Sequence, residues 1–406
     1  MAEMKINRVI IIPYKPKEIH KIARMEAGKL WTDIVKLHKY IRKRSMTSPD
    51  KWKWSNESAF EKHFKGRYNL HSQTIQGIIQ KFFANINTAL KNRKAGDKKA
   101  RLTYRYKKYF NVIFKGQAIK QMNNRIRLPL KNKKYIWINI PEINGKIVQA
   151  ELGYNRVFLT IQRVISVPEH TSNKVAAIDF GIIHTAVITD GDNDLAIVGR
   201  GIRSIKQGHA KNLAKMSKKL SKTKKGSKRR KKLIRAKFKL IEKTENRIRN
   251  ALHQVSRKLV SYCTENAISA VAYGDLAGIN ENKKKKRRKQ CNQEIGMMEF
   301  GTLYKYLEYK LSENGIKIEK ISERNTSKTC PVCGNEHKAQ RRTYKCKDCG
   351  YVGIRDLVGA YNIRNLYINS IIQHGFSVPP LHLKYLRPIK LIRVRSSLPL
   401  TRAKTA

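Results

Sequence analysis

Four of the six cysteines form two Cys-x-x-Cys pairs that twelve residues separate. The pairs are Cys330 with Cys333 and Cys346 with Cys349. A glycine follows each pair, at Gly334 and Gly350, and allows the backbone to turn so that its amides point toward the thiolates. Four thiolates at this spacing are typical of a tetrahedral Zn²⁺ site, a zinc ribbon. Four free thiols are the alternative, and the spacing argues against it.

Because four sulfur atoms leave no open coordination position, we expect this zinc site to be structural rather than catalytic. We also expect the module to fold only with its metal. His337 lies between the two pairs and is a further candidate ligand, although the four sulfur atoms already satisfy the ion. Cys263 and Cys291 lack this spacing and are predicted to be ordinary residues.

Two aspartates stand in apolar surroundings, where a carboxylate needs a partner. Asp179 ends the apolar stretch VAAIDFG just before a glycine, and Asp356 begins a predicted helix directly after the cysteines. A divalent metal is one partner for Asp179, and a salt bridge is the other. For Asp356 the alternative is helix capping, since a carboxylate is stabilised near a helix N-terminus. Neither residue decides between these alternatives alone.

Taken together, the aspartates fit the layout of an RNase H-like nuclease. A strand ends in Asp179, a β-meander follows, a later apolar strand ends near an acid, and Asp356 opens a final helix. Such folds gather acids from distant segments around two metal ions about 4 Å apart. One ion helps to deprotonate the attacking water, and the other stabilises the leaving 3′ oxygen. Hard oxygen ligands suit Mg²⁺ or Mn²⁺.

The net charge points to a polyanionic partner. Lys and Arg number 88 against 29 Asp and Glu, which gives +59 and a pI near 10.3. A field of this strength has no use in an enzyme of small metabolites, whereas a nucleic acid neutralises it. The sequence has no apolar run of membrane-spanning length, and its first residues lack the apolar core of a secretory signal. We therefore expect a cytoplasmic, nucleoid-associated protein without a membrane partner.

The N-terminal part predicts a small, wedge-like β-barrel with a helical insertion. Residues 1–14 and 101–172 supply short alternating strands, and residues 15–100 show apolar residues at helical spacing. Aromatic residues lie among the cations of the helical part: Trp31, Trp52, Trp54, Phe60, Phe64 and Tyr68. Stacking on nucleic-acid bases is one interpretation of them, but helix core surrounded by lysine stems is the favoured one.

The C-terminal part predicts a nuclease domain over residues 173–329 and 350–372, with the zinc ribbon inserted at 330–349. Within it, a basic helical hairpin covers 205–262 and turns at Gly226. Its second arm carries an apolar stripe that predicts packing: Ile234, Phe238, Ile241, Ile248, Leu252, Val255 and Leu259. The lysine-rich run 283–289 and the basic tail 373–406 are predicted to be disordered.

The C-terminal segments resemble the TnpB family, the RNA-guided nucleases of bacterial and archaeal insertion sequences. Fanzor proteins and compact type V CRISPR effectors are related to that family. The matching segments are AAIDFGIIHTAVITDG, AVAYGDLAGI, YLEYKLSENGIKI, TSKTCPVCG and CKDCGYVGIRDLVGAYNI. They run in the family's order through about half of the chain. The N-terminal strand, basic helices and barrel agree by layout with the family's lobe for guide RNA and target DNA.

One position departs from the family pattern. The second segment of the family's RuvC-like site usually carries Glu before Asp-Leu, whereas Gly274 precedes Asp275 here. Three explanations compete. Glu323 supplies the carboxylate, as in branches of the family with a relocated Glu; or Asp275 substitutes for it; or the site is inactive. We favour Glu323, because strand alternation points Asp275 away from the Asp179 side. Ile354 stands where relatives often show His.

The resemblance implies an α+β multidomain protein and an RNA-guided DNA endonuclease of a transposable element. A single RuvC-like site would hold two Mg²⁺ ions through Asp179, Glu323 and Asp356, and Arg355 would steer phosphate or form a plain salt bridge. The partners would be a guide RNA and a target DNA with a short flanking motif. Two alternatives remain: a nuclease-inactive, guide-directed repressor, and a DNA transposase that acts without a guide.

Overall fold

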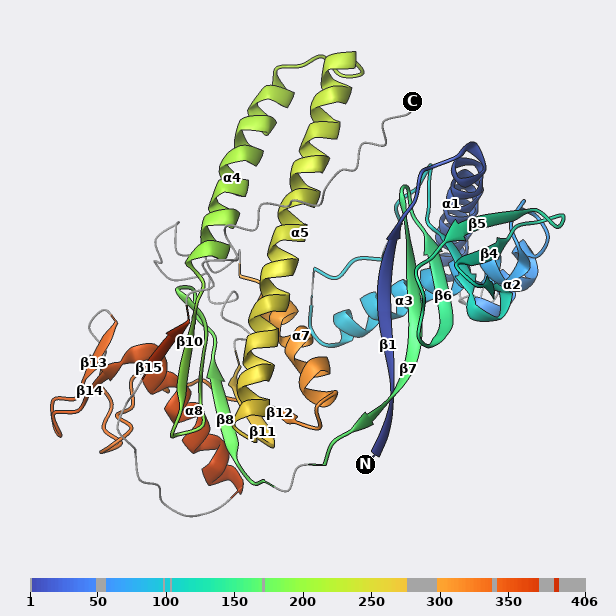
Figure 1. Ribbon diagram of the computed structural model, residues 1–406. Helices are drawn as coiled ribbons and strands as arrows, with labels where there is room; N and C mark the ends of the chain where they lie inside the picture. The colour runs from blue at the N-terminus through green and yellow to red at the C-terminus, as the bar shows by residue number, and fades with distance from the viewer. Residues whose placement is uncertain are drawn as a thin grey trace, which may run out of the picture. The chain divides into compact units, whose positions relative to one another are not determined.

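The structure is a computed structural model that describes residues 2–48, 56–97, 99–102, 104–169, 172–275, 298–337, 342–371 and 383–386 (Figure 1). The chain divides into two compact units. The N-terminal unit is Glu3–Ser166, and the C-terminal unit begins at Val167. Helices and strands occur in both, so the predicted α+β class is confirmed. Among the described residues, no helix combines the length and apolarity that crossing a bilayer requires.

The strands of the N-terminal unit form two sheets. One has the order β1-β7-β6-β2, with β1 Ala2–Pro13, β2 Val112–Lys115, β6 Lys146–Leu152 and β7 Arg156–Val167. The other is an antiparallel meander of β3 Lys120–Met122, β4 Arg125–Pro129 and β5 Tyr135–Asn139. Neither sheet closes on itself, so the predicted barrel is wrong in this respect. A short 3-10 turn at Gly116–Ala118 ends β2 after four residues and leads the chain into the second sheet.

Three helices share one hydrophobic core with these sheets: α1 Glu18–Thr47, α2 Glu57–Phe64 and α3 Ser72–Lys94. Trp31 of α1 is buried, stacks on Phe110 at 4.4 Å between ring centroids, and donates from Nε1 to the Arg105 carbonyl. Phe60 and Phe64 are also buried. Helix core is therefore confirmed as the role of these three aromatic residues, whereas Trp52 and Trp54 lie outside the described residues.

The C-terminal unit is built on a six-stranded sheet in the order β12-β11-β8-β9-β10-β15. Its strands are β8 Val175–Asp179, β9 His184–Thr189, β10 Asp194–Val198, β11 Ala270–Gly274, β12 Lys317–Ile321 and β15 Leu383–Leu386. β8, β11 and β12 run parallel, and β9 is antiparallel to β8 and β10. β15 pairs with β10 although disorder was predicted for the whole tail, because an edge strand offers unpaired backbone groups. The rest of the tail and residues 283–289 lie outside the described residues.

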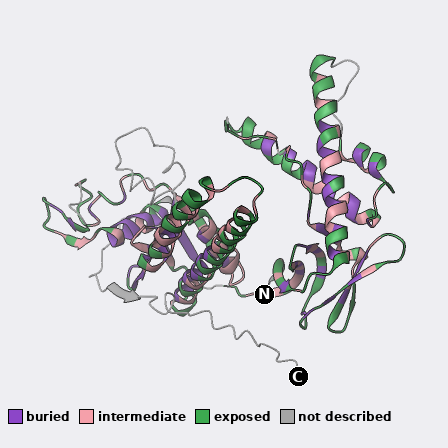
Figure 2. Ribbon diagram, turned by 90° about the horizontal axis from the view of Figure 1, so that it is seen from above, coloured by how far each residue is buried: buried purple, intermediate pink, exposed green. Residues whose placement is uncertain are grey.

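Helices cover both faces of this sheet. α5 Lys228–Glu265 and α7 Phe300–Ser312 share a core with Ala176 and Ile178 of β8. α8 Arg355–Ile371 packs on the opposite face, against Ala177. Because successive strand residues alternate between two covered faces, β8 is apolar from Val175 to Ile178, and Asp179 at its end is the exception. Figure 2 shows the buried residues, in purple, on the inner sides of the helices and the exposed residues, in green, on their outer sides.

The predicted basic hairpin consists of α4 Arg200–Ser221 and α5, and Gly226 turns it with a φ of +84°. The apolar stripe of α5 is buried from Ile248 to Leu259. Its earlier part differs from the prediction, since the Phe238 side chain is 66% exposed. The reason is positional: this part of α5 runs beside α4 beyond the end of the sheet, so no third layer covers it (Figure 1).

Helix α1 passes so close to the segment before β2 that Gly28 has no room for a side chain. A Cβ atom there would overlap the Lys108 carbonyl group. We expect Gly28→Ala to destabilise the N-terminal unit by about 1–3 kcal/mol, even though alanine is the better helix former. Hydrogen exchange should speed up in α1. Gly301→Ala in α7 is the control, because no atom lies within 4 Å of a Cβ there and exchange should slow. Similar effects of both substitutions would contradict the argument.

Candidate active site and cysteine cluster

Three parallel strands end at the same edge of the C-terminal sheet. Tyr273 of β11 pairs with Ile178 of β8, and Gly274 pairs with Ile321 of β12. The next residues along these strands are Asp179 and Asp275, and Glu323 follows β12 by two residues. Carboxyl ends of parallel strands are where α/β sheets place their functional groups. The register therefore brings the ends of three distant segments, and the carboxylates that follow them, to one edge of the sheet.

Helix α8 brings the fourth segment to this edge. Its Gly359 lies against Asp179, so that a Cβ atom at residue 359 would be 2.9 Å from Asp179 Oδ2. Asp356 lies three residues earlier, on the same side of the helix. Burial raises the pKa of Asp179 well above its usual value, and the charges of Glu323 and Asp356 raise it further, whereas Arg355 opposes them. Asp179 thus lies close enough to Glu323 and to Asp356 for both charges to act on its own.

Glu323 fills the space beside Gly274. A Cβ atom at residue 274 would overlap the Glu323 carboxylate, so the glycine leaves the room that this side chain uses. Glu323 Oε1 is buried and has no hydrogen-bond partner among the described residues. Burial, and then the charge of Asp275, raise the pKa of Glu323 to about 7. A carboxylate in this state is poised to bind a cation.

Asp275, the alternative third ligand, is engaged elsewhere. Its Oδ2 atom accepts an ion pair from Lys320 Nζ at 2.7 Å, and its backbone N–H donates to the Ile321 carbonyl at 2.7 Å. Its charge still reaches Glu323, as the raised pKa of that residue shows. The geometry thus favours Glu323 over Asp275 as the partner of Asp179.

A histidine from β9 holds Asp356, and nothing in the sequence pointed to it. His184 Nδ1 lies 2.8 Å from Asp356 Oδ2, and an Arg355 guanidinium nitrogen lies 3.4 Å from Oδ1. Burial acts to raise the pKa of Asp356, but the hydrogen bond with His184 and the charge of Arg355 outweigh it, so the pKa falls below its usual value. Ile354 stands at the position where relatives often show His, whereas the histidine that contacts Asp356 here lies 172 positions from that aspartate.

Asn362 of α8 is a second residue that the sequence reasoning missed. Its buried side-chain amide donates to the carbonyl of Thr326 at 2.7 Å and to that of Thr329 at 2.8 Å. These two carbonyls belong to the segment that joins Glu323 to the first cysteine. Asn362 therefore fixes the position of the Glu323 segment relative to the helix that carries Asp356.

The four predicted zinc ligands come together. Their sulfur atoms all lie within 4.8 Å of one another, with 3.6 Å between Cys330 and Cys349 and 3.5 Å between Cys333 and Cys346. A two-stranded ribbon of β13 Thr343–Lys345 and β14 Val352–Ile354 frames them. The expected turns are present, since Gly334 and Gly350 have φ values of +76° and +73°. Four cysteine sulfurs at this spacing suit tetrahedral Zn²⁺.

The surroundings shift the pKa values of the clustered thiols in different directions. Hydrogen bonds from the backbone of Cys349 chiefly, and also of Asp348, lower the pKa of the Cys346 thiol although burial opposes them. Burial raises the pKa of the Cys330 thiol, and burial with the neighbouring thiols raises the pKa of the Cys333 thiol. His337, the further candidate ligand, lies 2.7 Å from Asp348 through Nε2. Cys330 and Cys346 share a hydrophobic cluster with Val358, so the ribbon packs directly on α8.

The carboxylates are spaced more widely than the cysteines. In the described part of the chain, two groups bring three or more potential ligand atoms within 4.8 Å of one another: the four cysteines, and His337 with Cys346 and Asp348. Asp179, Glu323 and Asp356 are not such a group. Carboxylates that repel one another are expected to stand apart, and their oxygen atoms remain the donor type that Mg²⁺ and Mn²⁺ prefer.

Two parts of the chain match known protein families. Residues 157–280 match the family model described as "Probable transposase", and residues 300–363 match the one described as "Cas12f1-like, TNB domain". TnpB-like protein MJ0751 of Methanocaldococcus jannaschii is 29% identical over 120 residues. The predicted resemblance to the TnpB family is confirmed. The two family models cover different parts of the candidate site. Asp179 and Gly274 lie in residues 157–280, and Glu323, Asp356 and the four clustered cysteines lie in residues 300–363.

Two further relatives widen this picture. InsQ of Escherichia coli (strain K12) is 25% identical over 61% of this chain and 63% of its own length. A CRISPR-associated endodeoxyribonuclease Cas12f1 from an uncultured archaeon is 26% identical over 32% of this chain and 26% of its own length. The match to MJ0751 covers 29% of this chain and 42% of that protein. The chain thus matches less than two thirds of the length of each of these relatives.

The fold also has a solved counterpart. A cryo-EM structure of a Cas12f1–sgRNA–target DNA complex aligns with 86% of this chain and 82% of its own, with a TM-score of 0.61 and 18% identity. At that identity the likeness concerns the fold alone, so the chain shares the Cas12f1 arrangement of helices and sheets.

We expect Asn362→Ala to release the segment that follows Glu323. The variant leaves two buried carbonyls without their donor, which costs about 1–3 kcal/mol. Hydrogen exchange should therefore accelerate over residues 323–330. Asn369→Ala is the matched control, because that side chain is exposed on the same helix and its loss should change stability by less than about 0.5 kcal/mol. Unchanged exchange in the Asn362 variant would refute the proposed attachment.

We expect one zinc ion per chain, and we expect its removal to loosen α8 as well as the ribbon, because Val358 packs on the cysteines. Elemental analysis before and after chelation, followed by hydrogen exchange over 342–371, measures both effects. Cys333→Ser should lose the ion, whereas Cys263→Ala should keep it, since Cys263 is buried outside the cluster. A metal-free chain with full protection of α8 would contradict this coupling.

Proposed function

We propose that the chain is an RNA-guided DNA endonuclease of a transposable element, with a single RuvC-like site formed by Asp179, Glu323 and Asp356. The observation that carries the proposal is the contact between Gly274 and Glu323. The Glu323 carboxylate occupies the space into which a side chain at residue 274 would extend, beside Asp179. The middle carboxylate of the site is thus relocated along the chain rather than lost.

Electrostatics supports cation binding at this place. Burial raises the pKa of Asp179 and of Glu323, and the acidic neighbours raise both further. A divalent cation removes the repulsion and supplies a partner for the buried Glu323 Oε1 atom. Ligand atoms spread beyond 4.8 Å suit two ions about 4 Å apart better than a single ion.

The residues of the site divide the work among them. When bound, two Mg²⁺ ions would supply an activated water and would stabilise the leaving 3′ oxygen. Asp179, Glu323 and Asp356 would hold the ions, and His184 keeps the Asp356 carboxylate in one orientation through its 2.8 Å contact. The exposed Arg355 side chain stands next to Asp356 and is placed to contact a substrate phosphate.

The net charge of the chain and the names of its relatives support nucleic-acid partners. Cas12f1 relatives are named endodeoxyribonucleases, and the structural counterpart was solved with a guide RNA and target DNA. A net charge of +59 requires many phosphates, and the exposed lysines of the α4–α5 hairpin offer contacts for them. Target choice would rest on base pairing, and a short motif beside the target would be read by the protein. The protein would act on DNA in the cytoplasm of a prokaryote.

The test moves the glutamate from residue 323 to residue 274. Glu323→Ala should lower Mg²⁺-dependent cleavage at least about 100-fold, because a ligand worth several kcal/mol is lost. Gly274→Glu alone should also be inactive, since two side chains then compete for one space. The double variant Gly274→Glu/Glu323→Ala should recover part of the activity. Glu319→Ala, an exposed acid of β12, is the control.

The assay uses a plasmid target and the RNA that co-purifies with the chain, which is sequenced to define the guide. Full activity of Glu323→Ala, or a double variant no better than either single one, would overturn the relocation. A wild-type chain that binds its target but never nicks it would instead be a guide-directed repressor. Joining of strand ends without bound RNA would indicate a transposase.

A further inference from the structure

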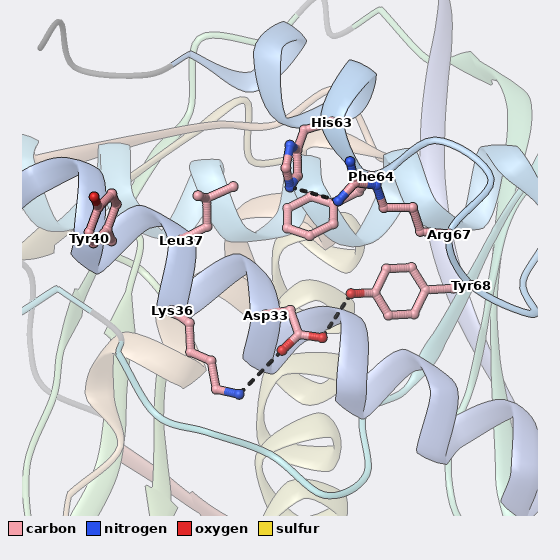
Figure 3. A pocket seen from close by; sticks show the side chains of 8 residues that line it. All are labelled: Asp33, Lys36, Leu37, Tyr40, His63, Phe64, Arg67 and Tyr68. Carbon is pink, nitrogen blue, oxygen red and sulfur yellow. Dashed lines mark hydrogen bonds and ion pairs between the residues drawn. The ribbon is translucent and has the colours of Figure 1, made fainter.

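A hollow of about 420 Å³ lies between α1 and the end of α2 in the N-terminal unit (Figure 3). Asp33, Lys36 and Tyr40 line it from α1, where their spacing puts them on one face of the helix. His63, Arg67 and Tyr68 line it from the opposite side. None of these residues belongs to the candidate active site.

The carboxylate of Asp33 is held in a fixed orientation within the hollow. The Tyr68 hydroxyl donates to Oδ2 at 2.9 Å, and Lys36 Nζ lies 3.5 Å from Oδ1 (Figure 3). The side chain is still 42% exposed, and the Lys36 contact is at the limit of hydrogen-bond length. A carboxylate has about four acceptor positions, so a ligand can add its own donors to Asp33.

The rest of the hollow offers two other kinds of contact. Leu37 adds apolar surface, and the Tyr40 ring is 50% exposed. Arg67 lies 3.2 Å from His63 Nε2, which leaves a cationic group at the rim (Figure 3). Aromatic and apolar surface suits the face of a nucleobase, and a guanidinium suits its phosphate.

The Asp33 carboxylate in this hollow suits contact with a nucleic-acid base rather than with the phosphate backbone. In a chain of net charge +59, a carboxylate weakens the attraction for phosphate, so it does not serve non-specific binding. It can accept N–H groups from a base edge, in the way that Asp and Glu accept from cytosine. Guanine presents two adjacent N–H donors on its Watson–Crick edge, which match the two oxygen atoms of one carboxylate.

We infer that this hollow binds a single unstacked guanine of a nucleic-acid strand, with Asp33 accepting from the base edge and Arg67 near the phosphate. The inference rests on the proposed function only in taking a nucleic acid as the partner. It adds a base-specific contact outside the cleavage site, on a unit that otherwise offers phosphates a cationic surface. Either the RNA or the DNA can supply the guanine.

The experiment measures binding of nine-nucleotide single strands to the full chain without Mg²⁺. One strand is all uridine, one carries a central guanosine, and one carries inosine there, which lacks the 2-amino group. All three have the same phosphates, so their differences isolate the base. We expect the guanosine strand to bind about 5-fold to 100-fold more tightly than the uridine strand, and inosine to lie between them. Deoxythymidine strands with the same central bases distinguish DNA from RNA as the source.

Asp33→Asn should abolish this preference and leave the affinity for the uridine strand unchanged or slightly higher. Glu18→Gln is the matched control, because Glu18 forms the same i, i+3 ion pair, with Lys21, on the same helix away from the hollow. Lys36→Met should leave the guanosine preference in place. Hydrogen exchange of α1 and α2 verifies that the variants fold.

Equal binding of the guanosine and uridine strands by the wild-type chain would overturn the inference. A preference that survives Asp33→Asn in a folded chain would also overturn it, because guanine would then be bound elsewhere. Loss of the preference in Glu18→Gln as well would do the same. Since the assay involves no cleavage, an inactive nuclease that still discriminates guanosine would refute the proposed function and leave this site standing.

Discussion

Three like charges at one sheet edge are the constraint around which the C-terminal unit is organised. Burial raises the pKa of Asp179 and Glu323, and each acidic neighbour adds to the effect. Such a group is stable when it is partly protonated or when cations neutralise it. The proposed divalent ions would relieve this unfavourable arrangement, and the buried Glu323 Oε1 atom, which has no hydrogen-bond partner in the described part of the chain, offers a ligand for them.

Helix α8 contacts the carboxylates, the cysteine cluster and the segment that joins them. Along one short stretch, Val358 packs on the cysteine cluster, Gly359 admits the Asp179 carboxylate, and Asn362 holds the segment after Glu323. Asp356 opens the same helix and is oriented by His184. The cysteine ribbon thus packs on the same helix that carries Asp356 and contacts Asp179 and the segment after Glu323.

The sequence predicted the elements well where periodicity is local. The strands that carry Asp179 and Gly274, the hairpin that turns at Gly226 and the helix after the cysteines all form near their expected places. The barrel was wrong because alternation reveals strands but not which edges pair, and the chain builds two open sheets instead. Phe238 is exposed because an apolar stripe shows what a helix could bury, whereas the extent of the sheet beneath it decides what is covered.

For the candidate site, the four cysteines, Asp179 and Asp356 could be predicted from the sequence, because their spacing or their apolar context is unusual within a few residues. The sequence also raised Glu323 as one of three explanations for Gly274. The tertiary structure alone decided that the Glu323 carboxylate fits the space beside Gly274, that His184 reaches Asp356, and that Asn362 holds the connecting segment. The physical reason is distance along the chain: these contacts join residues from 33 to 172 positions apart, and only the register of the strands and the packing of α8 bring them together.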